Sequence, residues 1–237
     1  MGPNGSGKST LLHVIAGLLD PAGGTIEVLG TSPAEARRRV AYVLQGQHAH
    51  HHLPVTAGEV VALGRAPSAG PFRRLSAADR AAVRTAMERV EVDTLANRHV
   101  SDMSGGQRQR VLIAQGLAQE ADVLLLDEPV AGLDIASITA IRRVIDEERA
   151  AGRTIVVATH DLSEAAAADT AVLLAGRVIA AGRPDEVLTA ANLRAAYAGR
   201  LVDVGEALLL DDGAHHHEHP HDPHGHAPHE HTHDHVD

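Results

Sequence analysis

The sequence predicts an α/β fold built on a parallel sheet, and three features predict it. A glycine-rich loop at residues 2–7 leads directly into a helical pattern of apolar residues. An apolar run at residues 123–126 ends in Asp127-Glu128-Pro129, where proline stops a central strand. Strand-like and helical segments then alternate to about residue 180. Such alternation is typical of parallel strands joined by helices.

The elements follow in a simple order along the chain. The spacing of apolar residues predicts a helix from Lys8 to about Gly17, where Asp20-Pro21 marks the stop. The Ala- and Arg-rich composition of residues 56–98 predicts a mostly helical stretch, and a further helix is expected after Ser104. The remaining predicted elements are strands at 25–29, 40–44, 123–126 and 154–159, helices at 135–150 and 162–168, and a strand pair around 171–180.

Composition limits the function classes. The 237 residues are 44% hydrophobic, enough for one domain with a core, and hold no run of about 20 apolar residues. Cysteine is absent, which excludes disulfides, thiolate metal sites and a catalytic cysteine, and fits a reducing cytoplasm. Aromatic residues are 1% of the chain, too few for base-stacking surfaces. Of the net charge of -10, -7 lies in residues 211–237, and residues 1–210 are near neutral at -3. No nucleic-acid partner is predicted.

The glycine-rich loop has the pattern of a phosphate-binding loop. Its glycines would let the backbone turn its N–H groups around a phosphate at the positive end of the following helix. Lys8 would reach the β- and γ-phosphates, and the Ser9 hydroxyl would bind Mg²⁺. Lys8 is the only lysine, against twenty arginines. The nucleotide-binding segment is Gly2, Pro3, Asn4, Gly5, Ser6, Gly7, Lys8, Ser9 and Thr10.

Two acidic residues complete this chemistry. Asp127 ends the apolar strand and could hold Mg²⁺ through water, and Glu128 beside it could orient a water molecule that attacks the γ-phosphate. The pair could also be a solvated strand end. That alternative loses weight because the same chain carries a phosphate loop.

A second helix start decides the family. Ser104, Gly105, Gly106 and Gln107 begin a helical run and form a second helix end suited to phosphate, although one nucleotide cannot easily use both ends within one subunit. Residues 102–110 resemble the signature segment of ABC ATPases, which contacts the γ-phosphate bound by the opposite subunit. Met103 departs from the usual leucine.

The resemblance extends to three further motifs in the same order. Gln45, after the predicted strand at 40–44, resembles the Q-loop; Ala131-Gly132-Leu133-Asp134 resembles the D-loop; and His160 resembles the switch histidine. By this resemblance Glu128 would be the general base and His160 would hold the attacking water. Gln45 would contact Mg²⁺ together with Ser9 and Asp127 and would sense the membrane partner, while Asp134 would link two subunits.

The family also implies an architecture. It implies a P-loop NTPase fold with a RecA-like parallel-sheet core over residues 1–210 and an inserted helical subdomain at about 56–104. Family members carry strands and an adenine-stacking aromatic before the loop, and the aromatics Tyr42, Phe72 and Tyr197 stand at none of the expected positions. We therefore expect the domain as written to lack its N-terminal strands and Met1 to be an internal methionine.

The resemblance further implies partners. The 58 residues between Gln45 and Ser104 suit a small subdomain that docks on a membrane protein rather than a long coiled coil. The expected partners are a second copy of the chain, which would close over ATP, membrane permease subunits, and an extracytoplasmic solute-binding protein reached through the permease. The chain would be peripheral, at the cytoplasmic face of the inner or plasma membrane.

Histidine suggests the cargo. Residues 211–237 hold seven acidic residues and no Lys or Arg, and read as a disordered tail. Their imidazoles suit Zn²⁺, Ni²⁺ or Cu²⁺, although a solubilising tail would have a similar composition. A second group, His48, His50, His51 and His52, could be a sensor or a plain polar loop. The tail histidines are His215, His216, His217, His219, His221, His224, His226, His229, His231, His233 and His235.

These observations together predict a function. The segment 177–197, with Gly182-Arg183-Pro184 and Asn192-Leu193, is similar to the carboxy-terminal part of bacterial metal importers. The sequence therefore predicts the ATP-hydrolysing subunit of an ABC importer for a divalent metal, zinc first. Two alternatives remain: an importer of a metal chelate or another small solute, and a truncated inactive relative whose tail buffers metal.

Overall fold

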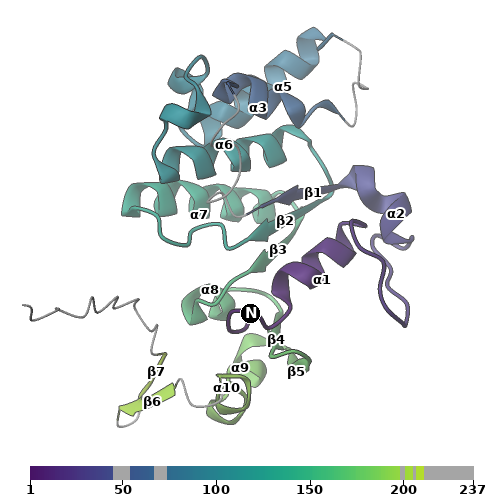
Figure 1. Cartoon of the computed structure of the whole chain (residues 1–237), viewed down its shortest axis with the longest axis vertical. Helices are drawn as coiled ribbons and strands as arrows, with labels where there is room; N and C mark the ends of the chain where they lie inside the picture. Colours follow the sequence, from purple (N-terminus) through teal and green to yellow (C-terminus); the bar gives the residue numbers. More distant parts are fainter. Residues whose placement is uncertain (45–53, 67–73, 198–200, 205–206, 211–237) are drawn as a thin grey trace, which may run out of the picture. The chain divides into compact units, whose positions relative to one another are not determined.

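The computed structural model describes residues 1–44, 54–66, 74–197, 201–204 and 207–210 (Figure 1). The chain divides into two compact units, Met1–Gly199 and Arg200–Asp237. The described part of the second unit is an antiparallel hairpin of β6 (Leu201–Val204) and β7 (Ala207–Leu210). The expected domain boundary at residue 210 stays a prediction. All of the fold and site described below belongs to the first unit.

Three parallel strands form the central sheet in the order β1-β2-β3. They are β1 (Val40–Val43), β2 (Val123–Asp127) and β3 (Thr154–Ala158). All five residues of β2 are buried because the strand lies between two others and is covered on both faces. This burial explains why its sequence is an unbroken apolar run rather than an alternating one. The predicted α/β class and parallel sheet are confirmed.

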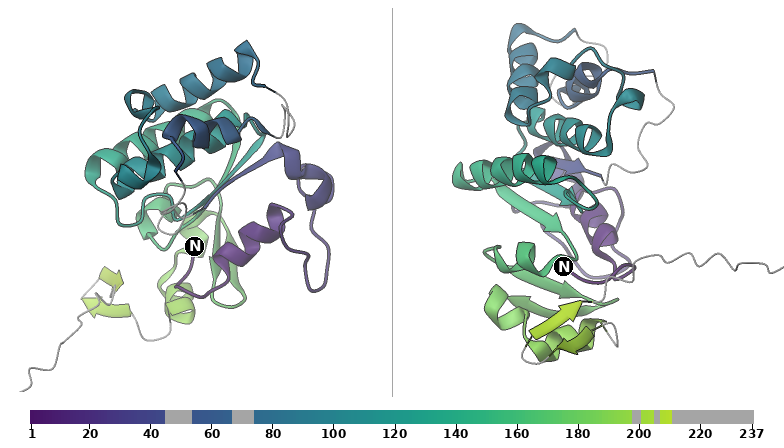
Figure 2. Two further views of the ribbon diagram at one scale, coloured as in Figure 1. Left: turned by 45° about the horizontal axis from the view of Figure 1, so that its top comes forward. Right: turned by 90° about the vertical axis from the view of Figure 1, so that its left-hand side faces the viewer.

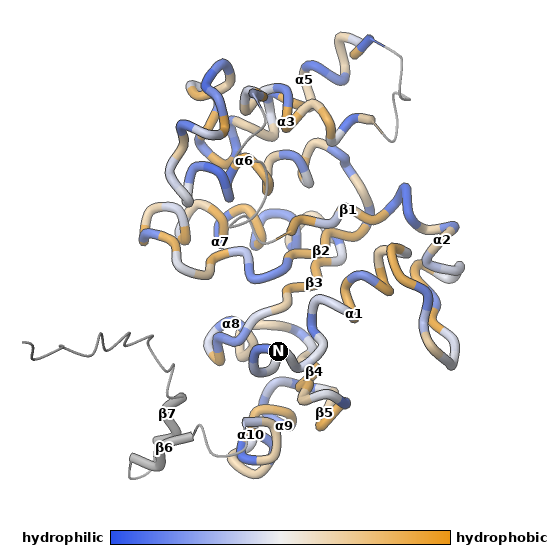
Figure 3. Tube along the Cα trace, viewed as in Figure 1, coloured by the Kyte–Doolittle hydropathy of each residue, from blue (hydrophilic) through white to orange (hydrophobic). Residues whose placement is uncertain are grey.

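Helices cover the two faces of the sheet separately. Alternate strand residues such as Val43 and Leu124 pack in one apolar cluster with α6 (Gly105–Ala118) and α7 (Ile135–Ala150). The intervening residues, such as Leu125, pack in a second cluster with α1 (Lys8–Ile15). The two views in Figure 2 show α1 and α7 on opposite sides of the sheet, and Figure 3 shows the apolar character of β2 between them. The helix after the glycine loop and the helix after Ser104 therefore lie on opposite faces.

A layer of further helices packs on α6. It contains α3 (Ala57–Leu63), α5 (Ala77–Arg89) and two short 3₁₀ turns at Asp93–Leu95 and Val100–Asp102. Both α-helices begin at a capping box, in which Thr56 pairs with Glu59 and Ser76 with Asp79. The prediction that residues 56–98 are mostly helical is confirmed for the described residues of this stretch, which are 56–66 and 74–98.

The chain after β3 forms five short helices and strands between residues 162 and 197. They are α8 (Leu162–Ala166), β4 (Ala171–Leu174), β5 (Val178–Gly182), α9 (Pro184–Val187) and α10 (Ala190–Tyr197). β4 and β5 pair antiparallel, which confirms the predicted strand pair. Among the described residues, none of the helices combines the length and apolar character that crossing a bilayer requires.

One predicted element is wrong. Residues 25–29 form no strand, although their composition favours one. Val28 and Thr31 exchange backbone hydrogen bonds of 2.8 and 3.1 Å, and Leu29 and Gly30 take positive φ values of 54° and 75°. The segment therefore closes a tight turn on itself instead of pairing with a neighbour. The following residues form a short helix α2 (Pro33–Ala36) and a 3₁₀ turn at Arg37–Arg39.

Candidate functional site

The glycine loop wraps around the start of α1. Gly5 and Gly7 take φ values of 77° and 100°, a region that side chains with a Cβ rarely adopt, and Gly7 caps the helix in this conformation. Gly2 is required for a different reason. A Cβ at this position would lie 2.2 Å from the carbonyl oxygen of Leu174. The loop is therefore shaped by its glycines, and it leaves Ser9 and Thr10 exposed in the first turn of α1.

The Lys8 ammonium points back into this loop. The side chain is 7% exposed, and its Nζ donates hydrogen bonds to the carbonyl oxygens of Gly2 at 2.9 Å and Pro3 at 3.2 Å. It also lies 3.4 Å from Glu128 Oε1. A buried cation is thus held at the loop by two main-chain oxygens and one carboxylate. This position fits the predicted role of Lys8 at a phosphate.

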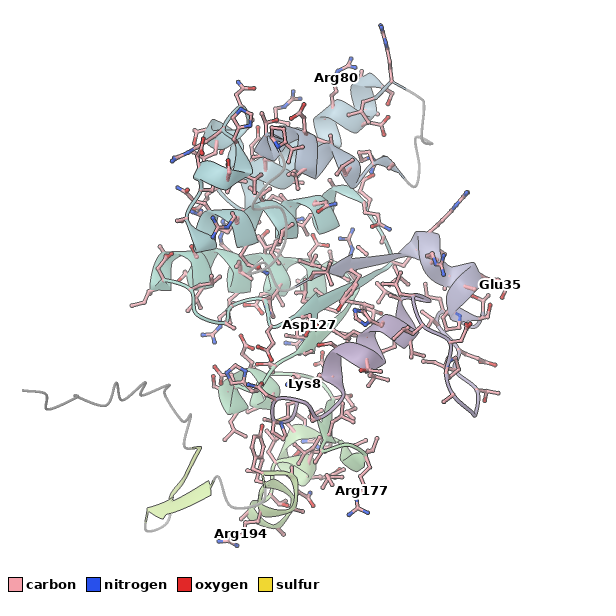
Figure 4. The ribbon with its side chains drawn as sticks, in the orientation of Figure 1. Lys8, Glu35, Arg80, Asp127, Arg177 and Arg194 are labelled. Carbon is pink, nitrogen blue, oxygen red and sulfur yellow. The ribbon has the colours of Figure 1, made fainter. Side chains whose placement is uncertain are left out.

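The two acidic residues stand at the carboxyl end of β2. Asp127 is the last residue of the strand and is 7% exposed. Glu128 takes a φ of 47°, the left-handed region that is uncommon for residues other than glycine, and its N–H donates to the carbonyl oxygen of Ala158 at 2.9 Å. The turn that follows the strand is thereby fixed at Glu128, whose carboxylate lies beside Lys8. Figure 4 shows Lys8 and Asp127 close together at this edge of the sheet.

His160 approaches the same carboxylate from the next strand. It follows β3, and Asp161 directly after it caps α8 by accepting hydrogen bonds from the N–H groups of Ser163 and Glu164. The distance from His160 Nδ1 to Glu128 Oε1 is 3.6 Å. Glu128 therefore has an ammonium and an imidazole within 4 Å of one oxygen atom.

A pocket opens beside this pair. Its lining includes Glu128 and His160 and two charged residues of neighbouring helices, Arg142 on α7 and Glu164 on α8. Arg142 lies 3.5 Å from Glu164 and 3.7 Å from Asp161. Burial raises the pKa of Asp161, but hydrogen bonds from Ser163 and Glu164 and the Arg142 charge together outweigh it and lower the pKa overall. Asp161 therefore stays ionised opposite Arg142. The pocket has a volume of about 200 Å³, which leaves room for several water molecules beside the Glu128 carboxylate and the His160 imidazole.

Asp127 has a partner that the sequence did not reveal. The Tyr42 hydroxyl on β1 donates a hydrogen bond of 3.2 Å to Asp127 Oδ2. Burial, followed by the nearby Asp127 charge, raises the pKa of Tyr42 well above its ordinary value, so the hydroxyl keeps its proton. This contact depends on the register of two strands that are about 80 residues apart in sequence, which no local pattern encodes.

The oxygen donors at this edge fit Mg²⁺ bound with a nucleotide. Mg²⁺ prefers hard oxygen ligands and is usually bound through one or two protein oxygens together with substrate phosphates. The Asp127 carboxylate and the Ser9 hydroxyl are donors of this kind, at the strand end and in the first turn of α1. Within the described ranges, no cluster of three or more His, Cys, Asp or Glu residues could form an all-protein metal site.

The second predicted phosphate-binding segment forms a separate group. Ser104 caps α6 through a capping box with Gln107, with distances of 3.0 and 3.2 Å. The space around the Cα of Gly105 is open. A Cβ on Gly106, by contrast, would lie 2.3 Å from Ser137 Oγ and 2.7 Å from Asp134 Oδ2. The helix end therefore needs glycine at position 106 and leaves Gly105 accessible.

Asp134 has a clear local role. Its side chain caps α7 by accepting hydrogen bonds of 2.9 Å from the Ser137 N–H and 3.0 Å from the Ser137 hydroxyl. These bonds lower the pKa of Asp134. The residue thus joins the start of α7 to the start of α6 within one chain, and a contact with a second chain stays a prediction.

The structure brings part of the predicted site together. Lys8 and His160 both lie within 4 Å of Glu128 Oε1, and Asp127 precedes Glu128 in the chain. The second group, Ser104–Gln107 and Asp134, lies at the starts of α6 and α7, two helices that cover the opposite face of the sheet from α1. Gln45, the histidines at 48 and 50–52, and all eleven tail histidines lie outside the described residues.

Sequence reasoning missed Tyr42 and Arg142. Tyr42 is the next-to-last residue of β1. The signal that could have found it is a hydroxyl-bearing residue near the carboxyl end of a strand, the same edge of the sheet at which the acidic pair follows β2. Arg142 lies about two turns into α7, a helix with several arginines, and nothing in the sequence distinguishes it from the other arginines of that helix.

Comparisons with known proteins agree with this geometry. A family model described as "ABC transporter" matches residues 1–131. The chain is 38% identical over 212 residues to the manganese transport system ATP-binding protein of Bacillus subtilis, covering 89% of this chain and 85% of the relative. It is 40% identical over 202 residues to the zinc transport system ATP-binding protein of Treponema pallidum, covering 85% and 76%.

Solved structures give the same result. A metal-chelate type ABC transporter in an inward-facing conformation superposes with a TM-score of 0.73 and 28% identity, covering 88% of this chain and 82% of that one.

Proposed function

The chain belongs to the ABC transporter family of ATP-binding subunits, and from this premise we propose that it hydrolyses ATP to power the uptake of a divalent metal ion. ATP hydrolysis is the activity of the family. The metal is the finer step, and it is supported by relatives named as manganese and zinc transport subunits over most of the chain.

One observation carries the catalytic proposal. Glu128 Oε1 lies 3.4 Å from the Lys8 ammonium and 3.6 Å from His160 Nδ1, at the end of a strand beside the phosphate loop. A carboxylate placed next to a phosphate-binding lysine can accept a proton from a water molecule, and the histidine can hold that water in line with the phosphate. Glu128 is therefore proposed as the general base and His160 as the residue that positions the water.

The neighbouring residues would bind the nucleotide. Lys8 would exchange its bonds with the Gly2 and Pro3 carbonyls for phosphate oxygens. Asp127 and Ser9, with Gln45, would hold Mg²⁺, which supplies charge neutralisation between the phosphates when bound. These residues would bind and orient the nucleotide and would take no part in proton transfer.

A second copy of the chain would complete the site. The helix that begins at Ser104 and the helix α1 cover opposite faces of one sheet, so one nucleotide cannot readily reach both helix ends in a single subunit. Two copies related by a two-fold axis would place Ser104, Gly105 and Gln107 of each copy over the phosphates held by the other. Asp134, which contacts the same helix end, would transmit the presence of the second copy.

The other proposed partners follow from the family. They are membrane permease subunits and, through them, an extracytoplasmic solute-binding protein, with this chain bound at the cytoplasmic face of the membrane. The predicted docking residues around Gln45 fall outside the described part of the structure.

ATP hydrolysis is tested with one matched pair of variants. The purified chain with its permease should hydrolyse ATP when Mg²⁺ is present. Glu128→Gln should keep nucleotide binding and lose turnover by at least about a hundredfold, because the shape of the side chain is retained while its basicity is lost. Glu164→Gln, in the same pocket but paired with Arg142, is the control and should retain most of the activity. Full turnover by Glu128→Gln would overturn the assignment of the base.

Zinc is proposed over manganese because of the tail. Imidazole suits zinc, whereas manganese favours carboxylate, carbonyl and water ligands. Uptake of radioactive Zn²⁺ and Mn²⁺ into cells that carry the complete transporter separates the two metals, with the Glu128→Gln transporter as background. Faster Mn²⁺ uptake would make the cargo manganese.

Binding of Zn²⁺ by the tail is a separate proposal. The full chain and a chain ending at residue 210 should be titrated with Zn²⁺ at pH 7.5 and pH 5.5. We expect sites that disappear with the tail and weaken at the lower pH, because protonated imidazole does not bind metal. Equal binding by both chains would leave the tail as a solubilising segment.

A second candidate cargo has its own support. The structural neighbour in an inward-facing conformation is a metal-chelate type transporter, so a chelated metal is the alternative to a free ion. Uptake assays that compare free metal with its chelate would distinguish them.

A further inference from the structure

Tyr42 lies on the strand next to the acidic pair, with its hydroxyl directed along the sheet. In the parallel pairing of β1 with β2, Tyr42 stands opposite Leu125, two residues before Asp127 on the same face. The hydroxyl spans this step and donates a hydrogen bond of 3.2 Å to Asp127 Oδ2. A buried carboxylate at the end of one strand is therefore held from the neighbouring strand.

The phenol ring is itself held in place. It packs against the apolar cluster that covers the α1 face of the sheet, which includes Leu12 and Leu125. The ring of His13, on the helix that follows the phosphate loop, meets it edge-on with ring centres 5.4 Å apart and planes at 87°. The direction of the hydroxyl is thus fixed by both the sheet and the helix that begins at Lys8.

We propose that Tyr42 is a positioning residue for the Mg²⁺–ATP complex, acting by orienting the Asp127 carboxylate. This inference rests on the proposed function, in which Asp127 holds Mg²⁺. Tyr42 is not proposed to touch the nucleotide or the metal. Its hydroxyl restricts rotation of the carboxylate, so less ordering remains to be done when the cation binds.

The position of Tyr42 adds a second consequence. It lies on β1, the strand that leads to Gln45, while Asp127 ends β2 and His13 lies on α1. The Tyr42 side chain therefore connects β1 with both β2 and α1, the elements that bear the predicted Mg²⁺ and phosphate ligands. A shift of β1 would change the orientation of Asp127 through this hydrogen bond.

The experiment measures Mg²⁺-dependent ATP binding rather than turnover. The affinity of the full chain for ATP is determined by equilibrium dialysis with 5 mM Mg²⁺ and with EDTA, and the ratio of the two affinities is the Mg²⁺ gain. Tyr42→Phe removes one hydroxyl and retains the ring that His13 contacts. Loss of a partner that orients a metal ligand typically lowers metal affinity by about tenfold or more. We therefore expect Tyr42→Phe to lower the Mg²⁺ gain by roughly tenfold and to leave the affinity in EDTA unchanged.

The chain provides a matched control. Tyr197, the other tyrosine, is buried on α10, which packs on β4 and β5. Tyr197→Phe removes the same atom away from the acidic pair and should leave the Mg²⁺ gain unchanged. Thermal unfolding followed by circular dichroism shows whether each variant is folded.

The outcomes separate this inference from the proposed function. An unchanged Mg²⁺ gain in Tyr42→Phe overturns the positioning role, as does an equal loss of affinity in Mg²⁺ and EDTA, which would indicate a merely structural role. Failure of the Tyr42→Phe chain to fold would also show that role. Absence of any Mg²⁺ gain in the unaltered chain would instead overturn the assignment of Asp127, and the positioning role with it.

Discussion

The Lys8 ammonium lies 3.4 Å from Glu128 Oε1, so the proposed phosphate ligand and the proposed base are paired with each other. Both side chains are largely buried, with exposures of 7% and 15%. The ammonium is therefore shared between this carboxylate and the carbonyl oxygens of Gly2 and Pro3. Arrival of a phosphate would draw the ammonium away and release Glu128 toward water and His160.

This pairing predicts the effect of neutralising the base on binding. In Glu128→Gln the phosphate no longer competes with a carboxylate for Lys8 and is no longer repelled by one. We expect ATP to bind about three- to tenfold more tightly, the range given by about 1 kcal/mol of charge interaction in a partly buried site. Titration with a fluorescent ATP analogue measures the change.

The control for this prediction is Glu164→Gln. Glu164 lines the same pocket, but its charge partner is Arg142. Its neutralisation should change ATP affinity by less than twofold. An affinity of Glu128→Gln equal to or weaker than that of the unaltered chain would show that the pairing has no influence on nucleotide binding.

Two adjacent glycines at the start of α6 allow a second prediction. A Cβ on Gly106 would lie 2.3 Å from Ser137 Oγ, whereas a Cβ on Gly105 would meet open space. Gly106→Ala should therefore destabilise the protein by about 1–3 kcal/mol, because the start of α7 must shift. Gly105→Ala should be neutral or stabilising by up to about 1 kcal/mol, because alanine is the better helix former. Urea unfolding of both variants measures the difference.

The opposite order of stabilities would show that the close approach of α6 to Ser137 is not maintained in solution. ATPase activity gives an independent reading of the same pair. If Gly105 faces a phosphate of the second copy as proposed, Gly105→Ala should lower turnover while leaving the fold intact.

Particular residues show how far the sequence alone could go. The bounds of α7 are those predicted, because Asp134 is a good cap and the apolar spacing persists for four turns. β2 was readable because a strand buried on both faces is apolar throughout. The prediction of a strand at residues 25–29 is wrong because a β-rich segment forms a strand only where a neighbouring strand offers hydrogen bonds. Val28 instead exchanges its backbone hydrogen bonds with Thr31.

The site divides in the same way. Lys8, Asp127, Glu128 and His160 belong to local motifs, so their chemistry could be read from sequence. Tyr42 could not be assigned, because its contact with Asp127 depends on which strands are neighbours and in which register, and both are decided by packing of the whole sheet.

A buried carboxylate between the helical layers carries a third prediction. Glu148 on α7 is 5% exposed and is paired with Arg89 on α5 and with Arg153. Glu148→Gln would leave Arg153 without its counter-charge and Arg89 with Glu147 alone, so we expect a loss of about 3 kcal/mol in the free energy of unfolding, the lower end of the range for a broken buried ion pair. Glu147→Gln is the control. Its carboxylate pairs with the same Arg89 but is 41% exposed, and its loss should cost less than about 1 kcal/mol.

Guanidinium chloride unfolding is unsuitable for this comparison because the salt screens charge, so urea is the denaturant of choice. Equal effects of the two substitutions would show that burial of Glu148 does not strengthen its ion pairs. The comparison also reports on the attachment of α5 to α7, since Arg89 is the residue through which Glu148 reaches the helical layer.

The last prediction concerns pH. Hydrogen bonds from Ser76 and an ion pair with Arg65 lower the pKa of Asp79 from its ordinary value of 3.8 to about 2. A carboxyl group whose pKa is lower in the folded than in the unfolded state stabilises the fold fully above the unfolded value, and this contribution disappears as the pH falls toward the folded value. The stabilisation from Asp79 should therefore be complete above about pH 5 and decline between pH 4 and pH 2.

Asp79→Asn removes this titration while retaining an oxygen that can accept from Ser76. The difference in unfolding free energy between the unaltered chain and Asp79→Asn should be constant from pH 7 to pH 5 and should shrink below pH 4, as measured by urea unfolding at each pH. Asp185→Asn tests a carboxylate paired with Arg183 on the surface, where both side chains are about 70% exposed. Its effect should be close to zero at every pH, because an exposed ion pair is screened by water and salt. A difference for Asp79→Asn that stayed constant down to pH 3 would mean that its carboxyl group titrates alike in the folded and unfolded chains, contrary to the bonds that Ser76 and Arg65 make with it.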